Sequence, residues 1–243
     1  MLPRTPGSQG DRAPSRPERS AEPVPSAIKH VEDSAVSRFP GFPVSRKMSK
    51  LESICVFCAS SIGARPLYAE SARRFGEVLA AREITLVFGG GCVGLMGVLA
   101  DATLGAGGRA IGVIPRALAE REIAHRGLTT LHVVETMHER KQRMADLADA
   151  FVMLPGGFGS WDEFCEVVTW AQLGFHRKPL GVLNVAGYYD PILEMADRAV
   201  AEGFVSAVQR DRLIVDDEGE RLLDRLAAAP MPSEVKWLPA VAP

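Results

Sequence analysis

The stretch that decides the fold reads Val152-Met153-Leu154-Pro155-Gly156-Gly157-Phe158-Gly159-Ser160-Trp161-Asp162-Glu163. It predicts an apolar strand, a glycine loop and then a helix, which we expect over residues 160–174. Gly156, Gly157 and Gly159 let the backbone turn sharply and approach a ligand without a Cβ in the way. The first N–H groups of a helix lack partners within it and bind anions. The stretch therefore predicts a site for a phosphate group.

Ser160 and Glu163 leave two interpretations open. If Ser160 is the N-cap, Glu163 is the third helical residue, and Ser-x-x-Glu is a capping box that stabilises the helix by about 1 kcal/mol. In the other interpretation, Glu163 is a carboxylate placed for chemistry, within one turn of a phosphate bound at the helix start. The two roles do not exclude each other.

Apolar strands alternate with amphipathic helices on both sides of this stretch. We expect strands near residues 53–58, 84–88, 109–114, 129–134, 150–154, 180–184 and 212–215. We expect helices at residues 66–82, 93–106, 136–148, 160–174, 189–201 and 217–228. The strands are continuous apolar runs, as in a parallel sheet with helices on both faces. The pattern predicts a doubly wound, mostly parallel, Rossmann-like α/β fold that binds ligands at the carboxyl ends of its strands.

The composition suits one globular domain, which we expect over residues 48–229. The 243 residues are 47% hydrophobic and 24% charged, as in a globular protein with a sizeable core. Residues 1–47 are rich in Pro, Ser and Arg and lack apolar periodicity, so we expect a disordered tail, with Met48 as an alternative start. Residues 230–243 predict an irregular C-terminal tail.

Charge and hydropathy favour a small-molecule ligand. The net charge of -2 gives no positive field for nucleic acid or an anionic membrane. No apolar run reaches the roughly 20 residues that span a bilayer, so we expect a cytoplasmic protein. The four cysteines, which we expect to be reduced thiols without a metal, are Cys55, Cys58, Cys92 and Cys165.

Two other strand ends carry candidate substrate contacts. Ser60 follows the first strand, and a second glycine loop, with Gly90 and Gly91, follows the next. That loop contains G-x-G-x-x-G, but the strand after it ends without the acid that holds a dinucleotide ribose, so we do not expect NAD. The loop is instead a second candidate for anion binding.

Arg140 and Lys141 begin the helix that precedes the deciding stretch. One interpretation is a solvated basic face. The other is a phosphate site, because a guanidinium can hold two phosphate oxygens at once.

Several of these blocks, taken together, resemble the LOG (Lonely Guy) family of cytokinin riboside 5'-monophosphate phosphoribohydrolases, which are often mislabelled lysine decarboxylases. The resemblance covers about residues 52–215. Its blocks are Ile54-Cys55-Val56-Phe57-Cys58-Ala59-Ser60, the loop at residues 89–97, Met137-His138-x-Arg140-Lys141, Pro155-Gly156-Gly157-x-Gly159-Ser160-x-x-Glu163 and Thr169-Trp170-Ala171-Gln172-Leu173-Gly174.

The resemblance implies hydrolysis of the N-glycosidic bond of an adenine-type nucleoside 5'-monophosphate, without metal or organic cofactor. It implies that Arg140 and Glu163 are the catalytic pair. It places around the substrate Lys141, Gly156, Gly157, Gly159, Ser160, Glu122 and Thr169. It also implies a homodimer or larger homo-oligomer. Ser160 stands where the family usually has Thr, Ala59 where Gly is common and Cys92 where Ser is common.

Two competing functions remain. PLP-dependent lysine decarboxylation needs a Schiff-base lysine with a partner for the pyridine nitrogen, and no such pair is identifiable. A nucleotide or molybdenum-cofactor carrier of similar fold would keep the glycine loops but would not need Arg140 together with Glu163. The presence of both favours the hydrolase.

Overall fold

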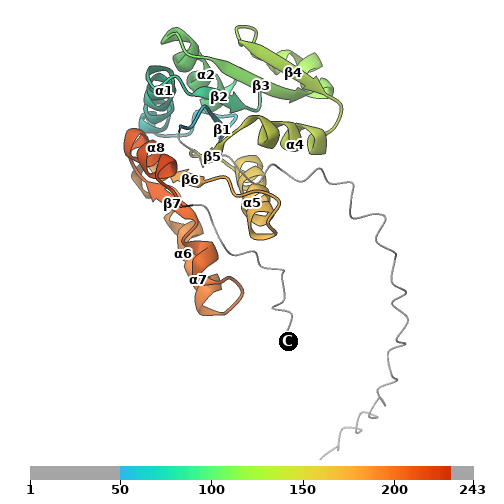
Figure 1. Ribbon diagram of the computed structural model, residues 1–243. Coiled ribbons are helices and arrows are strands. Elements are labelled where there is room, and N and C mark those ends of the chain that lie inside the picture. The colour runs from blue at the N-terminus through green and yellow to red at the C-terminus, as the bar shows by residue number, and fades with distance from the viewer. Residues whose placement is uncertain (1–49, 231–243) are drawn as a thin grey trace, which may run out of the picture. The chain divides into compact units, whose positions relative to one another are not determined.

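The computed structural model describes residues 50–230, in which the side chains of residues 121 and 122 are left out (Figure 1). The tail predicted for residues 1–47 lies outside the described residues, as does the C-terminal tail from residue 231 onward. None of the helices in the described range has the length and apolar character needed to cross a bilayer.

A seven-stranded sheet forms the centre of the described range, with strand order β4-β3-β2-β1-β5-β6-β7. All neighbouring strands are parallel. The strands are β1 Ser53–Phe57, β2 Thr85–Phe88, β3 Ala110–Pro115, β4 Thr130–Val134, β5 Ala150–Met153, β6 Leu180–Leu183 and β7 Leu213–Asp216. All seven predicted strands are therefore confirmed. The order reverses between β1 and β5, so the point at which such folds bind ligands lies at the ends of these two strands.

The six predicted helices are also present. They are α1 Pro66–Ala81, α2 Gly94–Gly105, α4 Met137–Leu147, α5 Phe158–Gln172, α6 Asp190–Ala201 and α8 Gly219–Ala227. Four short elements were not predicted: α3 Arg116–Leu118, the π-helical turn η2 Ala119–Ile123, the 3₁₀ turn η3 Val185–Gly187 and α7 Ala207–Arg210. Proline stands in the first turn of both α1 and α6, where its missing N–H has no partner to lose.

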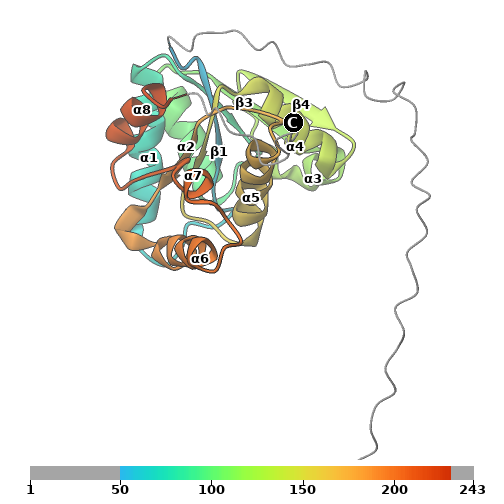
Figure 2. The same ribbon diagram turned by 60° about the horizontal axis from the view of Figure 1, so that its bottom comes forward.

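Helices cover both faces of the sheet (Figure 2). Side chains alternate along the strands and build a core on each face. Ile54 and Val56 of β1 pack with α1, α2 and α8, whereas Cys55 and Phe57 pack with α4 and α5. Each large apolar side chain buried in this way stabilises the fold by about 1.5–3 kcal/mol. Cys58 belongs to the first face and Cys55 to the second, so the two thiols cannot pair; burial raises the pKa of both.

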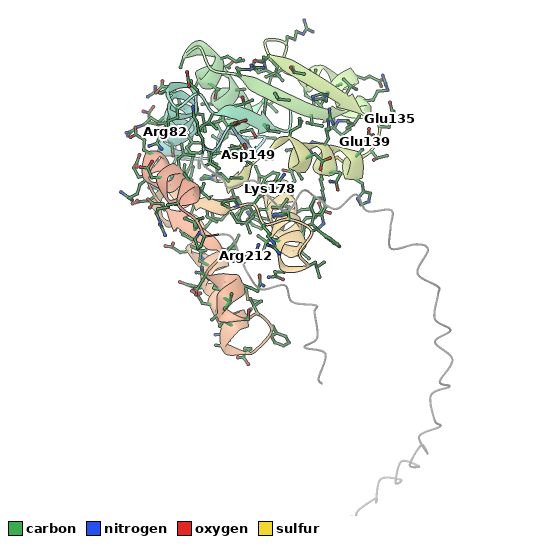
Figure 3. The ribbon with its side chains drawn as sticks, in the orientation of Figure 1. Arg82, Glu135, Glu139, Asp149, Lys178 and Arg212 are labelled. Atoms are coloured by element: carbon green, nitrogen blue, oxygen red, sulfur yellow. The ribbon has the colours of Figure 1, made fainter. Side chains whose placement is uncertain are left out.

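Two cations, Lys178 and Arg212, bind carbonyl groups near the C-terminal ends of α4 and α5 (Figure 3). Lys178 donates from Nζ to the carbonyl of Ala145 at 2.6 Å, near the end of α4. Arg212 donates from Nη1 to the carbonyl of Ala171 at 2.7 Å, near the end of α5. Cations are favourable at helix C-termini, where carbonyl groups lack partners. The two helices are thus held where they pack side by side on one face of the sheet.

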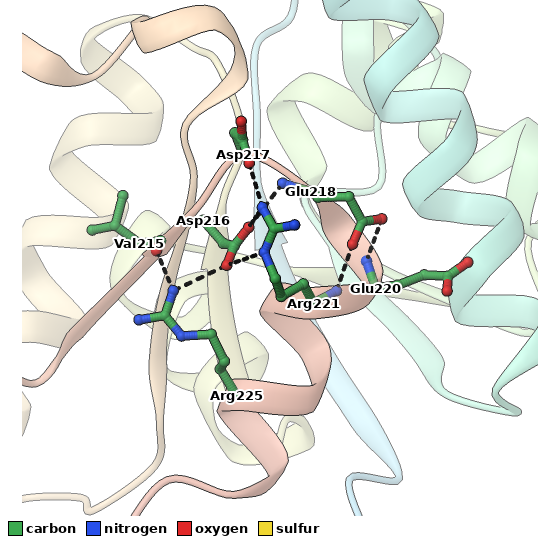
Figure 4. A network of polar contacts seen from close by, with 7 residues as sticks. All are labelled: Val215, Asp216, Asp217, Glu218, Glu220, Arg221 and Arg225. Atoms are coloured by element: carbon green, nitrogen blue, oxygen red, sulfur yellow. Dashed lines mark hydrogen bonds and ion pairs between the residues drawn. The ribbon is translucent and has the colours of Figure 1, made fainter.

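A charged network joins β7 to α8 (Figure 4). Asp216, at the end of β7, accepts hydrogen bonds from Arg221 Nε at 2.9 Å and Arg225 Nη1 at 3.0 Å. Glu218 caps α8 by accepting from two backbone N–H groups. Burial raises the pKa of Asp216, but the hydrogen bonds from Arg221 and the Glu218 backbone outweigh it and lower that pKa to about 2. The network has a structural role in holding the last helix.

Candidate active site

Helix α5 begins at Phe158, two residues before the predicted start, and Gly157 is its N-cap. Ser160 is therefore the third helical residue and Glu163 the sixth, so the predicted capping box between them is wrong. The cause is packing. Ser160 is buried, and its Oγ lies 2.2 Å from where a Cβ on Gly156 would be, a contact that only glycine allows. The Glu163 side chain does not cap its own helix.

Glu163 instead faces Arg140 of α4. Its Oε1 lies 3.0 Å from Arg140 Nη1, and both side chains are 11% exposed. Arg140 Nε also donates to the carbonyl of Val113, at 3.1 Å, near the end of β3. The interpretation of Arg140 as part of a solvated basic face is therefore wrong. Two helices and a strand end bring one buried ion pair together.

Gly89 makes room for the guanidinium of Arg140, a role that the sequence alone did not reveal. A Cβ at this position would lie 2.1 Å from Arg140 Nη2 and 3.3 Å from the sulfur of Met96. The first glycine of the G-x-G-x-x-G match thus serves a neighbouring arginine. The sequence signal for this role is weak: Gly89 is a glycine at the end of a strand, and only the burial of Arg140 beside it shows why glycine is needed.

The start of α4 carries the hydrogen bonds of a cap that the sequence analysis missed. Thr136 is the N-cap and accepts from the N–H of Glu139 at 3.1 Å. The Glu139 carboxylate accepts in return from the N–H of Glu135 at 2.9 Å. This Thr-x-x-Glu tetrad was readable from the sequence. It fixes the first turn of the helix that carries Arg140.

Lys141 bridges the same two helices. Its Nζ lies 2.7 Å from Asp162 Oδ2 and 3.1 Å from Glu166 Oε2, and its side chain is 14% exposed. Lys141 is therefore not part of a solvated face either. Its charge lies between two carboxylates of α5, one residue before and three residues after the catalytic candidate Glu163.

Burial has the largest effect on the ionisation of Glu163. It raises the pKa of the Glu163 carboxyl, and the nearby cations Arg140 and Lys141 lower it without cancelling the rise. A carboxyl with a raised pKa is a stronger base than an exposed glutamate. Beside a guanidinium, such a group can stabilise positive charge on a ligand or accept a proton from water.

Gly157 and Gly159 are exposed, and a Cβ on either would meet no atom within 4 Å. Neither of these two glycines has a positive φ. Neither packing nor backbone conformation therefore requires glycine at these two positions. Their small size leaves the start of α5 open to an approaching ligand.

The second glycine loop is packed differently. Gly90 and Gly91 are buried, and the carbonyl of Gly90 accepts from the N–H of His125 at 2.8 Å. The N–H of Cys92 donates to the carbonyl of Ile123, also at 2.8 Å. The loop is thus covered by the segment that follows η2. A role for Gly90 and Gly91 in binding substrate stays a prediction.

The first N–H groups of α2 are used within the protein. Leu95 donates to the carbonyl of Ser61 and Met96 to that of Ala59, both at 3.3 Å. Gly94 has a φ of +61° and lies so close to the first loop that a Cβ would be 2.2 Å from the carbonyl carbon of Ser60. These donors are occupied, so the prediction of a second anion site at the start of α2 is not supported.

The remaining candidate residues are Ser60, Thr169 and Glu122. Ser60 is exposed after β1. Thr169 is exposed on α5, and its hydroxyl donates to the carbonyl of Cys165 at 2.8 Å, within the same helix. Glu122 falls in η2, and its side chain is outside the described part of the chain. Their roles stay predictions.

Comparison with known proteins decides the family. A family model described as "Possible lysine decarboxylase" matches residues 96–226. The cytokinin riboside 5'-monophosphate phosphoribohydrolase LOG7 of Arabidopsis thaliana is 49% identical over 177 residues, which is 73% of this chain and 81% of the relative. LOG1 of the same plant is 46% identical over 178 residues, 73% of this chain and 84% of the relative.

The chain belongs to the LOG family. The relative named "Probable cytokinin riboside 5'-monophosphate phosphoribohydrolase LOGL9", from Oryza sativa subsp. japonica, is 42% identical over 209 residues, 86% of this chain and 91% of the relative. The match to these relatives confirms the resemblance carried by the sequence blocks.

Solved structures with the same fold include proteins of other function. The molybdenum cofactor binding protein of Rippkaea orientalis has a TM-score of 0.57 and 17% identity to this LOG-family chain, covering 74% of it and 97% of its own chain. The molybdenum cofactor carrier protein of Chlamydomonas reinhardtii has a TM-score of 0.56 and 19% identity, with coverage of 74% and 100%. At such identities the likeness confirms the Rossmann-like fold alone.

Proposed function

We propose that this LOG-family protein hydrolyses the N-glycosidic bond of adenine-type nucleoside 5'-monophosphates, releasing free base and ribose 5-phosphate. The observation that carries the proposal is the buried pair of Glu163 and Arg140, 3.0 Å apart. Glu163 lies on α5, the helix whose start carries the exposed Gly157 and Gly159, and Arg140 reaches it from α4. Relatives at 42–49% identity are named for this reaction on cytokinin riboside 5'-monophosphate.

Glu163 supplies the chemistry at the sugar. Breaking a ribosyl C–N bond builds oxocarbenium character on the ribose, and a carboxylate close to the ring stabilises that charge or orients the attacking water. Burial strengthens the interaction because few water molecules screen it. Arg140 holds the carboxylate in place and offers a cation to the negative charge that develops as the base departs.

The start of α5 supplies the phosphate site. Its N–H groups and helix dipole favour an anion, and no side chain caps them. A phosphate held there fixes the ribose at a set distance from Glu163, so binding energy is converted into orientation of the reacting carbon. In this proposal Ser160 and Lys141 contribute to the phosphate surroundings.

The carrier alternative has less support. The carriers that share the fold are 17–19% identical to this chain, whereas the named hydrolases are 42–49% identical. A carrier would also have no use for a buried carboxylate whose pKa is raised.

The substrate range, location and assembly belong to the same proposal. We infer activity on AMP as well as on cytokinin nucleotides, in the cytoplasm, by a homodimer. Exposed apolar side chains on the two helices of the ion pair support the dimer: Met137 on α4, Phe158 at the start of α5 and Phe175 just after its end are 44%, 84% and 54% exposed. Exposed apolar surface is one feature of protein interfaces.

The test is chromatography of AMP and isopentenyladenosine monophosphate after incubation with the wild type and with Glu163→Gln. The wild type should release free base. Glu163→Gln should lose about 100- to 1000-fold in kcat, since it removes a charge aimed at the transition state. Glu194→Gln, on the exposed side of α6, is the matched control and should be fully active. A wild type that binds both nucleotides without releasing base overturns the proposal.

A further inference from the structure

Two adjacent tyrosines donate hydrogen bonds to the loop after β5. Tyr188 donates its hydroxyl to the carbonyl of Gly156 at 2.7 Å, and Tyr189 donates to the carbonyl of Leu154 at 2.6 Å. Both follow the turn η3, and the N–H of Tyr189 donates to the side chain of Asn184 at 2.7 Å. A braced turn after β6 therefore holds two carbonyls of the glycine loop.

The bond to Gly156 fixes more than one atom. A trans peptide unit is planar, with its C=O and N–H pointing to opposite sides. When Tyr188 holds the carbonyl of Gly156, the N–H of Gly157 must point away from Tyr188. Gly157 is the N-cap of α5, at the end of the helix that is open to a ligand. The tyrosine thus sets the direction of a donor it does not touch.

This peptide is the one in the loop that most needs a lock. It joins two glycines, and glycine adopts positive and negative φ with similar ease, so the unit can rotate at small cost. A rotated unit would aim the Gly156 carbonyl, a partial negative charge, where the Gly157 N–H now lies. An anion would then meet an acceptor in place of a donor.

We propose that Tyr188 is a positioning residue for the substrate phosphate: its hydroxyl locks the Gly156–Gly157 peptide so that the Gly157 N–H serves the phosphate. The inference rests on the proposed function, because it takes the phosphate at the start of α5 as given. Tyr188 acts through the loop and needs no contact with the substrate.

Tyr189 provides a matched control within the same pair. Its hydroxyl donates to the carbonyl of Leu154, and the next residue is Pro155, which has no N–H to direct. The same hydroxyl also interacts with the N–H of Gly156, which belongs to the Pro155–Gly156 peptide and not to the Gly156–Gly157 peptide. Tyr189 is fully buried, whereas Tyr188 is 36% exposed. If both hydroxyls only stabilise the fold, removing the buried one should do more harm. If Tyr188 aims a donor, removing its hydroxyl should weaken phosphate binding selectively.

The experiment compares Tyr188→Phe and Tyr189→Phe in the full chain. Calorimetry measures the binding of ribose 5-phosphate, steady-state kinetics measures KM and kcat for AMP, and thermal unfolding measures stability. Tyr188→Phe should weaken ribose 5-phosphate binding and raise KM by about tenfold, the scale of one hydrogen bond to a charged group, with kcat and unfolding temperature nearly unchanged. Tyr189→Phe should lower the unfolding temperature and leave binding within about twofold.

Each outcome is decisive. Equal ribose 5-phosphate binding by Tyr188→Phe and the wild type, or equal loss in the two variants, overturns the lock. The proposed function fails separately, when the wild type binds ribose 5-phosphate but releases no base from either nucleotide. In that case the binding measurements on the two variants still test the lock.

Discussion

The two glycine loops of this protein join a strand to a helix at the same edge of the sheet, yet their glycines serve different needs. At residues 89–94, added Cβ atoms would strike Arg140 from Gly89 and the backbone of Ser60 from Gly94. At the start of α5, Cβ atoms on Gly157 and Gly159 would meet nothing within 4 Å. The first loop needs these glycines to pack, and in the second loop only Gly156 is needed for packing, so Gly157 and Gly159 are glycines for a reason other than packing.

The backbone donors divide in the same way. The helix after the first loop gives its early N–H groups to carbonyls of Ser61 and Ala59. In the described part of the chain, the first N–H groups of the helix after the second loop, those of residues 158–160, meet no such acceptor. A glycine loop is thus evidence for a ligand site where the fold itself does not use its glycines and donors. Both loops still serve one site, because the arginine admitted by Gly89 meets Glu163 of α5.

The largest effect is expected at Gly94. Alanine there would combine a positive φ of +61° with a clash of 2.2 Å against backbone, and should lower the free energy of unfolding by about 3 kcal/mol or more. Gly105, at the end of the same helix, has open space around its Cβ position. Gly105→Ala should cost nothing or slightly stabilise. Urea unfolding followed by circular dichroism measures both, and equal stability of the two variants would contradict the packing role of Gly94.

In the second loop we expect a smaller effect, which falls on substrate binding and not on stability. Gly157→Ala and Gly159→Ala place a methyl group on the open face, so KM for AMP should rise about tenfold through a lost or lengthened phosphate hydrogen bond. Stability should not fall, and Gly159→Ala, within the helix, should gain about 0.5–1 kcal/mol. Kinetics and urea unfolding on the same preparations separate the two effects. An unchanged KM in both variants would mean that the ligand approaches elsewhere.

The sheet and its six main helices could be predicted because each strand is a continuous apolar run and each helix repeats its apolar face. The start of α5 could not. Ser160 fits the rule for an N-cap, but its contact with Gly156 involves residues on both sides of the loop and is visible only in three dimensions. The cap formed by Thr136 and Glu139 differs, because it joins residues three apart in one helix start and its Thr-x-x-Glu pattern is visible in the sequence.

The sequence offers Arg140, Lys141 and Glu163 as candidates, but it does not show how they lie in space. Spacing alone could not show that Arg140 is buried against Glu163, because the contact joins two helices through a gap that Gly89 leaves open. It also could not show that Lys141 lies between two carboxylates. The short elements between residues 116 and 123 lack an apolar repeat of their own and so left no periodic signal.

The smallest effect concerns Glu163, which pairs with the arginine that lies beside Gly89 of the first loop. If ionised Glu163 is the active form, kcat/KM must fall as the pH drops through the pKa of that carboxyl, which burial raises above its usual value. Lys141 lowers this pKa and Asp162 raises it. Lys141→Met should therefore shift the acid limb of the profile to higher pH, and Asp162→Asn should shift it to lower pH.

The opposite signs make this pair of variants informative, because Lys141 and Asp162 are 2.7 Å apart and either change breaks the same ion pair. A loss of packing between α4 and α5 would lower activity in both variants without moving their limbs in opposite directions. The measurement is kcat/KM for AMP across the acid range, with Glu163→Gln as the reference that should show no such limb. Limbs that move together, or that persist in Glu163→Gln, would assign the titration to another group and contradict a role for ionised Glu163.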